Sequence, residues 1–203
     1  MKIFKLGQAE EETIIRECIS ALSVNGSVLL VPTETVYGLV CRASDKDAAK
    51  KIYELKKRSE NKPLALFVHD VEALKKTDAL LLPAAEKLAS KLCPGPLTII
   101  VPDKSGLSKT GFRIPDHNFV LKLLRELGEP LASTSANLSG KPPALTVDEA
   151  LADFNGEPEL AVDSGPLPEN AIPSTVVDFS ADGFRILREG PVSEETIRDI
   201  IGE

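Results

Sequence analysis

The sequence has few of the residues that usually mark covalent catalysis, metal binding or secretion. It contains three cysteines, two histidines and no tryptophan among 203 residues. An odd number of cysteines without paired spacing gives neither a disulfide framework nor a zinc motif. The amino terminus has no apolar stretch of signal-peptide length, and no segment reaches the roughly 18 apolar residues of a membrane span. We therefore expect a soluble cytoplasmic protein that does not associate with membranes.

An excess of positive charge is also lacking. The chain has 24 Lys and Arg residues against 31 Asp and Glu residues, a formal net charge of -7. This balance argues against a protein that coats nucleic acid over a broad surface, although it leaves room for a local basic pocket. The Walker loop and the Gly-x-Gly-x-x-Gly fingerprint, which are the two common phosphate-binding loops, are both absent from the sequence.

Hydrophobic periodicity predicts alternating helices and strands. Apolar residues at helical spacing predict helices over 9–25, 83–92, 116–127 and 193–201, with further helices that begin near 44–47 and at Thr146. Apolar runs predict strands at 27–31, 64–68, 97–101 and 112–114, and near 159–163, 174–179 and 184–188. Several late strands follow one another without a helix between them. We expect an α/β fold in one domain over 1–203, with a twisted mixed sheet flanked by helices and no second domain.

The segment from Ser27 to Leu39, SVLLVPTETVYGL, changes character within one residue. Its first half is typical of a strand that is covered on both faces. Pro32 ends that strand, and hydrogen-bonding side chains then follow at Thr33, Glu34, Thr35 and Tyr37. Such a concentration indicates either the cap of a short helix over 35–39 or a ligand site.

Cations and small polar residues also collect at the ends of other predicted elements. They occupy the segments 56–63, 133–141, 173–175 and 188–190, and Arg113 lies just before a proline. Arginine binds phosphate or carboxylate in a planar, bidentate way, and serine hydroxyls with backbone N–H groups can complete an anion site. In an acidic protein this set predicts one concave basic pocket beyond the strand ends.

Each feature also has a purely structural interpretation. Four cations at a helix end are usually solvated and favourable to the helix dipole, and Ser-Ala-Asn-Leu-Ser-Gly is more often a turn. Arg113 could be half of a structural ion pair. Cys41 and Cys93 are better explained as small buried hydrophobic residues than as nucleophiles, and the two histidines as surface or loop residues.

Taken together, the motifs resemble the YrdC/TsaC family. They occur in that family's order and spacing from about residue 10 to 200, and they are PTETVYGL (32–39), Lys56-x-Arg58 with Lys62-Pro-Leu, PGPLT (94–98), Arg113-Ile-Pro, STSANLSG (133–140), STVVD (174–178) and Arg188-Glu-Gly. The resemblance implies a nucleotidyltransferase, threonylcarbamoyl-AMP synthase, which joins L-threonine, bicarbonate or CO₂, and ATP and releases pyrophosphate. It further implies Mg²⁺ bound with ATP, a downstream tRNA threonylcarbamoyl transferase and room for weak tRNA binding.

The same resemblance assigns site residues by motif. It places the threonine on Thr33, Arg113, Thr134 and Ser174, with Arg113 on the carboxylate. It gives catalytic roles to Lys56 and Arg58, and nucleotide contacts to Arg58, Lys62, Ser135, Asn137 and Arg188. Tyr37 and Ser139 are secondary candidates, and no protein side chain is expected to bind the metal.

The chain departs from the family pattern at two positions. Phe67 stands where some relatives have histidine, with His69 two residues further on, and Pro143 stands where some have serine after the Lys-Pro of the Ser-Ala-Asn loop. Three alternatives to an active synthase stay open. One is an RNA- or tRNA-binding module of the same fold, which the net charge of -7 and the 4% aromatic content disfavour. The second is the carbamoyl-adenylate domain of hydrogenase maturation proteins, and the third is a weakly active paralogue.

Overall fold

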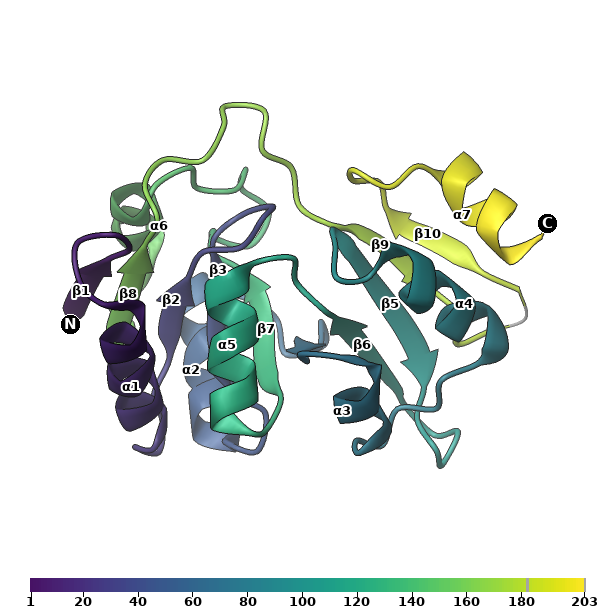
Figure 1. Ribbon diagram of the computed structural model, residues 1–203, viewed down its shortest axis with the longest axis horizontal. Helices are drawn as coiled ribbons and strands as arrows, with labels where there is room; N and C mark the ends of the chain where they lie inside the picture. The colour runs from purple at the N-terminus through teal and green to yellow at the C-terminus, as the bar shows by residue number, and fades with distance from the viewer. Residues whose placement is uncertain (182, 203) are drawn as a thin grey trace.

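A mixed β-sheet runs through the protein from one end to the other (Figure 1). The computed structural model describes residues 1–181 and 183–202. Within these residues the sheet has ten strands in the order β1 (Lys2–Lys5), β8 (Leu160–Asp163), β2 (Leu29–Val31), β3 (Gly38–Arg42), β7 (Leu131–Ser135), β4 (Ala65–Phe67), β6 (Lys109–Arg113), β5 (Leu97–Pro102), β9 (Thr175–Asp178) and β10 (Arg185–Arg188). Parallel and antiparallel neighbours both occur, as in the pairs β5/β9 and β5/β6. The expected mixed α/β sheet is thereby confirmed.

Helices cover both faces of the first half of the sheet. On one face lie α1 (Glu11–Leu22) and α5 (Asn118–Leu127), and on the other lie α2 (Lys46–Lys56) and α6 (Val147–Asp153). Side chains alternate along each strand, so Leu29 and Val31 join the α1/α5 core while Val28 and Leu30 join the α2/α6 core. This double burial explains the unbroken apolar run that predicted the strand.

The second half of the sheet is different, because its helices pack together on one side. The helices α3 (Val71–Lys75), α4 (Pro83–Leu92) and α7 (Glu194–Ile201) form a third core with Leu97, Ile99 and Val101 of β5. The intervening residues Thr98 and Ile100 point to the opposite face, where they line a cavity. A long connection from β8 to β9 arches across the top of the view in Figure 1 and joins the two halves.

The structure corrects several details of the predicted elements. The proposed short helix over 35–39 is wrong, since Gly38 begins β3 and the preceding residues form a turn. The strand β1 and the five-residue helix α3 were not expected from the sequence. The predicted helix at Thr146 is confirmed, because its hydroxyl accepts the backbone N–H of Glu149 at 3.1 Å.

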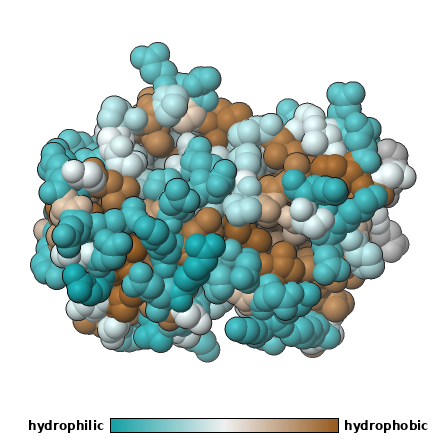
Figure 2. Space-filling model, viewed as in Figure 1, coloured by the Kyte–Doolittle hydropathy of each residue, from teal (hydrophilic) through white to brown (hydrophobic). Residues whose placement is uncertain are grey.

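The surface in Figure 2 is largely hydrophilic, with apolar patches near the middle of the face shown. None of the helices in the described part of the chain has the length and apolarity to cross a membrane.

Candidate active site

A cavity of about 620 Å³ lies on the helix-free face of β5, β6 and β9 and extends to the ends of β2, β4 and β7. Five of its lining residues are basic, and none of the lining residues in the described ranges is acidic: the cations are Arg58, Lys62, Lys109, Arg113 and Arg188. Hydroxyl groups supply much of the remaining polar wall: Thr33, Thr98, Ser133, Thr134, Ser135 and Ser174. This composition suits an anionic ligand that also needs directed hydrogen bonds.

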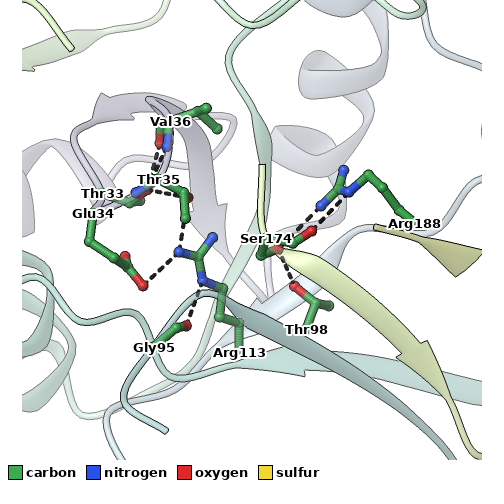
Figure 3. Close-up of polar contacts among 9 residues, drawn as sticks. All are labelled: Thr33, Glu34, Thr35, Val36, Gly95, Thr98, Arg113, Ser174 and Arg188. Atoms are coloured by element: carbon green, nitrogen blue, oxygen red, sulfur yellow. Dashed lines mark hydrogen bonds and ion pairs between the residues drawn. The ribbon is translucent and has the colours of Figure 1, made fainter. Parts of the chain in front are cut away.

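Thr33 builds the turn that follows β2 (Figure 3). Its hydroxyl donates to the carbonyl of Val36 at 2.6 Å and accepts the backbone N–H groups of Thr35 and Val36, each at 3.2 Å. The residue is 4% exposed. These three hydrogen bonds close a compact turn of the kind that Ser and Thr form with their own backbone. The turn presents Glu34 and Thr35 towards the strand β6.

Both of these side chains contact Arg113. Its Nη2 lies 2.7 Å from Oε1 of Glu34 and donates to Oγ1 of Thr35 at 2.9 Å, while Nε donates to the carbonyl of Gly95 at 3.3 Å. The Arg113 side chain is 6% exposed and that of Glu34 is 19% exposed. Arg113 is therefore one half of an ion pair, and it is also part of the cavity wall.

Ser174 connects a second arginine to the cavity. Arg188 donates from Nε to the Ser174 carbonyl at 2.9 Å and from Nη2 to its hydroxyl at 3.1 Å. The same hydroxyl lies 2.9 Å from Oγ1 of Thr98. Desolvation, followed by the positive charges of Arg113 and Arg58, lowers the pKa of Arg188. Because these three guanidinium groups repel one another, an anion between them would be stabilising.

The loop after α2 brings the third arginine to the cavity wall. Arg58 donates from Nε to the carbonyl of Lys62 at 3.1 Å and from Nη2 to that of Pro63 at 3.3 Å. Desolvation lowers the pKa of its guanidinium group. Lys62 is exposed and lines the same side of the cavity. Both residues line the cavity and carry a positive charge.

Lys56 occupies a different place from the other cations. It is 1% exposed, and its ammonium group donates to the backbone carbonyls of Ser135 and Asn137. Burial, followed by the charge of Arg58, lowers its pKa to about 7. Asn137 completes this arrangement, because its Oδ1 accepts the Ser135 hydroxyl at 2.6 Å and its Nδ2 donates to the Lys141 carbonyl at 2.6 Å. Lys56 and Asn137 are not among the described residues that line the cavity.

Comparison with known proteins identifies the family of this chain. A family model named Sua5/YciO/YrdC and described as "Telomere recombination" matches residues 22–190. The chain belongs to this family. A protein of Bacillus subtilis named threonylcarbamoyl-AMP synthase is 39% identical over 195 residues, which cover 90% of this chain and 55% of that protein. A relative from Methanocaldococcus jannaschii is 34% identical, with 95% of this chain and 93% of that protein covered.

Solved structures of the Sua5/YciO/YrdC family have the same fold. Pyrococcus abyssi Sua5, crystallised with L-threonine, matches with a TM-score of 0.89 and 33% identity over 100% of this chain and 62% of that one. Escherichia coli YciO matches with a TM-score of 0.83 at 23% identity, which supports the fold alone. This chain spans little more than half the length of the Bacillus subtilis relative.

The cavity brings together most of the residues that the family motifs single out. Eight of the predicted site residues in the described ranges line it: Thr33, Arg58, Lys62, Arg113, Thr134, Ser135, Ser174 and Arg188. Tyr37 lines it as well, but Ser139 does not. Phe67, which stands in place of a family histidine, is also part of the wall, whereas His69 and Pro143 are not.

Sequence reasoning missed some of the residues in and around the cavity. Thr98 is one, and the signal that could have found it is a single hydroxyl at an alternate position of an apolar strand. Lys109 is another, and its ammonium lies 2.8 Å from Oδ2 of the buried Asp178. The interpretation of the cysteines fits the structure, because burial raises the pKa of Cys41 to about 12 and that of Cys93 to about 11. Thiols with such values are poor nucleophiles.

Proposed function

We propose that this chain catalyses the ATP-dependent synthesis of L-threonylcarbamoyl-adenylate from L-threonine and bicarbonate or CO₂, with release of pyrophosphate. Two relatives named threonylcarbamoyl-AMP synthase are 39% and 40% identical to this chain over most of its length. The observation that carries the proposal is the cavity wall, in which five cations and a set of hydroxyls face one space without a lining carboxylate in the described residues.

The proposed reaction needs a cavity wall that carries positive charge. After the threonine amine captures CO₂, an oxygen of the resulting carbamate attacks the α-phosphorus of ATP. The bond from that phosphorus to the oxygen bridging to the β-phosphorus breaks in line, and pyrophosphate leaves. Two anions must approach each other in this step, so positioning and charge neutralisation do most of the work and no protein nucleophile is required.

The residues divide into two groups under this proposal. Threonine lies at the end of the cavity formed by Arg113, with Thr33, Thr134 and Ser174 nearby, and its carboxylate binds Arg113. The nucleotide phosphates lie at Arg58, Lys62 and Arg188. Ser135 contacts the nucleotide from the end of β7.

Lys56 and Asn137 act as positioning residues in this scheme. The Lys56 ammonium is bound to two backbone carbonyls, and Asn137 holds the Ser135 hydroxyl. Both therefore fix the shape of the Ser135 loop from behind the cavity wall. Hydrogen bonds of this kind, from residues behind a site, commonly set how well the groups in the site are oriented.

Magnesium would be bound mainly by the nucleotide. Among the described residues, no three or more His, Cys, Asp or Glu side chains form a group that could hold a metal ion. On this proposal the ion is carried on phosphate oxygens and water, as Mg²⁺ commonly is at nucleotide sites. The bound ion would neutralise phosphate charge alongside Arg58 and Arg188.

The proposal extends to the setting of the reaction. The mixed anhydride product would be consumed by a transferase that modifies tRNA, and we place the protein in the cytoplasm. The unbroken sheet from β1 to β10 supports one YrdC-like domain over residues 1–203.

Pyrophosphate release tests the function directly. Purified protein is given ATP, Mg²⁺ and bicarbonate, with and without L-threonine, and release should require both threonine and bicarbonate. Arg58→Ala should lower the rate by about tenfold to a hundredfold, because a charge-assisted contact to phosphate is lost. Arg125→Ala is the matched control, since Arg125 is exposed on α5 and lies outside the cavity wall. Threonine-independent release, or equal loss in both variants, would refute the proposal.

A further inference from the structure

Gly38 leaves a small open space in the wall of the cavity. It is the first residue of β3, and it lines the cavity together with Phe67 of β4 and Thr134 of β7. A Cβ atom on Gly38 would lie 3.5 Å from the backbone carbonyl oxygen of Thr134 and 4.0 Å from Cε2 of Phe67. Apart from the chain neighbours of Gly38, no other atom of the described residues would lie within 4 Å of it. The space is therefore bounded by a carbonyl and a phenyl ring and continues into the cavity.

The fold itself does not require a glycine at position 38. Gly38 is not one of the glycines with a positive φ, and it pairs regularly with Val31 of β2 and Ser135 of β7. Contacts of 3.5 and 4.0 Å from a Cβ atom are ordinary van der Waals distances. Gly190 is different, because a Cβ atom there would lie 2.4 Å from a backbone nitrogen. An alanine would therefore fit β3 without strain, and the room that Gly38 leaves is not used by the protein.

The phenyl ring of Phe67 connects this space to Arg113. Cζ of Arg113 lies 5.8 Å from the centroid of the ring, within the range of a cation–π contact. The two residues are also direct partners in the parallel pairing of β4 with β6, and both line the cavity. Phe67 is 5% exposed and packs into the α1/α5 core, which fixes its ring. A ligand carboxylate on Arg113 would therefore bring the carbon atoms attached to it close to an apolar wall.

Threonine differs from serine only by a methyl group on the β-carbon, and the space beside Gly38 is bounded on one side by an apolar ring. We propose that this space takes the methyl group of L-threonine, so that Gly38 and Phe67 select threonine over serine. This inference rests on the proposed function and adds two specificity-determining residues to it. An apolar pocket distinguishes ligands that differ by one carbon by about 10- to 200-fold, which sets the size of the expected preference.

Calorimetric titration of the full chain with L-threonine and L-serine, without ATP, tests this selection. The wild type should bind threonine at least about tenfold more tightly than serine. Gly38→Ala fills the space with a carbon of its own, so it should weaken threonine by about tenfold or more and change serine by about twofold or less. Gly111→Ala is the matched control, because it adds the same carbon to another part of the cavity wall, 3.4 Å from Cγ1 of Ile100. It should keep the wild-type ratio of the two affinities.

The outcomes separate this inference from the proposed function. An unchanged ratio in Gly38→Ala, or an equal fall in Gly111→Ala, overturns the role of this space even in a protein whose pyrophosphate release requires threonine. A threonine preference that disappears in Gly38→Ala alone, without threonine-driven pyrophosphate release, supports this inference and refutes the synthase. Equal affinity of the wild type for the two amino acids, or binding of neither, overturns the inference. A Gly38→Ala protein that does not fold overturns it as well, because the space would then not be free.

Discussion

The buried ammonium group of Lys56 should give the protein a distinctive dependence of stability on pH. The perturbation is Lys56→Met, which keeps a long apolar side chain but removes the amine. In the wild type the group is 1% exposed, and burial lowers its pKa from 10.5 to about 7. The two carbonyl acceptors on Ser135 and Asn137 favour the ammonium and work in the opposite direction.

The sign and size of the effect follow from proton linkage. Between pH 7 and 10.5 the unfolded chain keeps the Lys56 proton while the folded chain loses it. The free energy of unfolding should then rise with pH by at most about 1.4 kcal/mol per pH unit. Because the carbonyl acceptors oppose the shift, we expect about 1–2 kcal/mol between pH 7 and 9. For a chain of this size that is about 2–8 °C in melting temperature.

Urea denaturation at several pH values provides the assay. The wild-type free energy of unfolding minus that of Lys56→Met should increase from pH 7 to pH 9. Lys50→Met is the matched control, because it removes a lysine from an exposed position of the same helix. Its curve should run parallel to that of the wild type. If the curve of unfolding free energy against pH for Lys56→Met also runs parallel to that of the wild type, Lys56 keeps its proton throughout this range. The argument from burial would then be wrong.

Three further substitutions test contacts around the cavity. Tyr37→Phe should cost about 1–2 kcal/mol in urea denaturation, because the buried hydroxyl donates to the Gly165 carbonyl at 2.7 Å. Asp178→Asn should cost about 1–3 kcal/mol at pH 7. Burial favours the protonated form of Asp178, but hydrogen bonds, among them that from Lys109, lower its pKa below 3.8. The loss of unfolding free energy in Asp178→Asn should therefore shrink as acid protonates the wild-type carboxylate. A difference that stays constant with pH would contradict this. Gly190→Ala should destabilise by at least about 2 kcal/mol in thermal denaturation, because its Cβ would meet backbone atoms at 2.4 and 2.5 Å.

The sequence predicts those parts of the fold that depend on local patterns. The strand at 27–31, the helix cap at Thr146 and the helix start at Pro83 follow from periodicity, capping chemistry and the preference for proline in the first turn. The strand β3, with the sequence GLVCR, was missed because it directly follows a turn whose hydroxyls resemble a helix cap. The helix α3 has five residues, which is too short for helical periodicity to be recognised.

The site could be predicted as a set of residues but not as a set of contacts. Arg113 was selected by its position before a proline, yet nothing in the local sequence pairs it with Glu34, which lies 79 positions earlier. Lys56 was grouped with Arg58 because both are cations at one helix end. Its ammonium is instead bound to backbone carbonyls 79 and 81 residues away. Every residue has a carbonyl, so such partners leave no signal in the sequence.

The position of the cavity follows from the same alternation that builds the core. In β5 the residues Leu97, Ile99 and Val101 pack against the helices, while Thr98 and Ile100 face the cavity. In β6 the alternation continues, with Gly111 and Arg113 on the cavity side. A strand that is covered on both faces has no reason to place a hydroxyl or a guanidinium group at alternate positions, because burying such groups without partners is costly. A polar residue at such a position, as at Thr98 in β5 and Arg113 in β6, therefore indicates that this face is kept for a ligand, and both side chains already have partners from neighbouring segments of the protein.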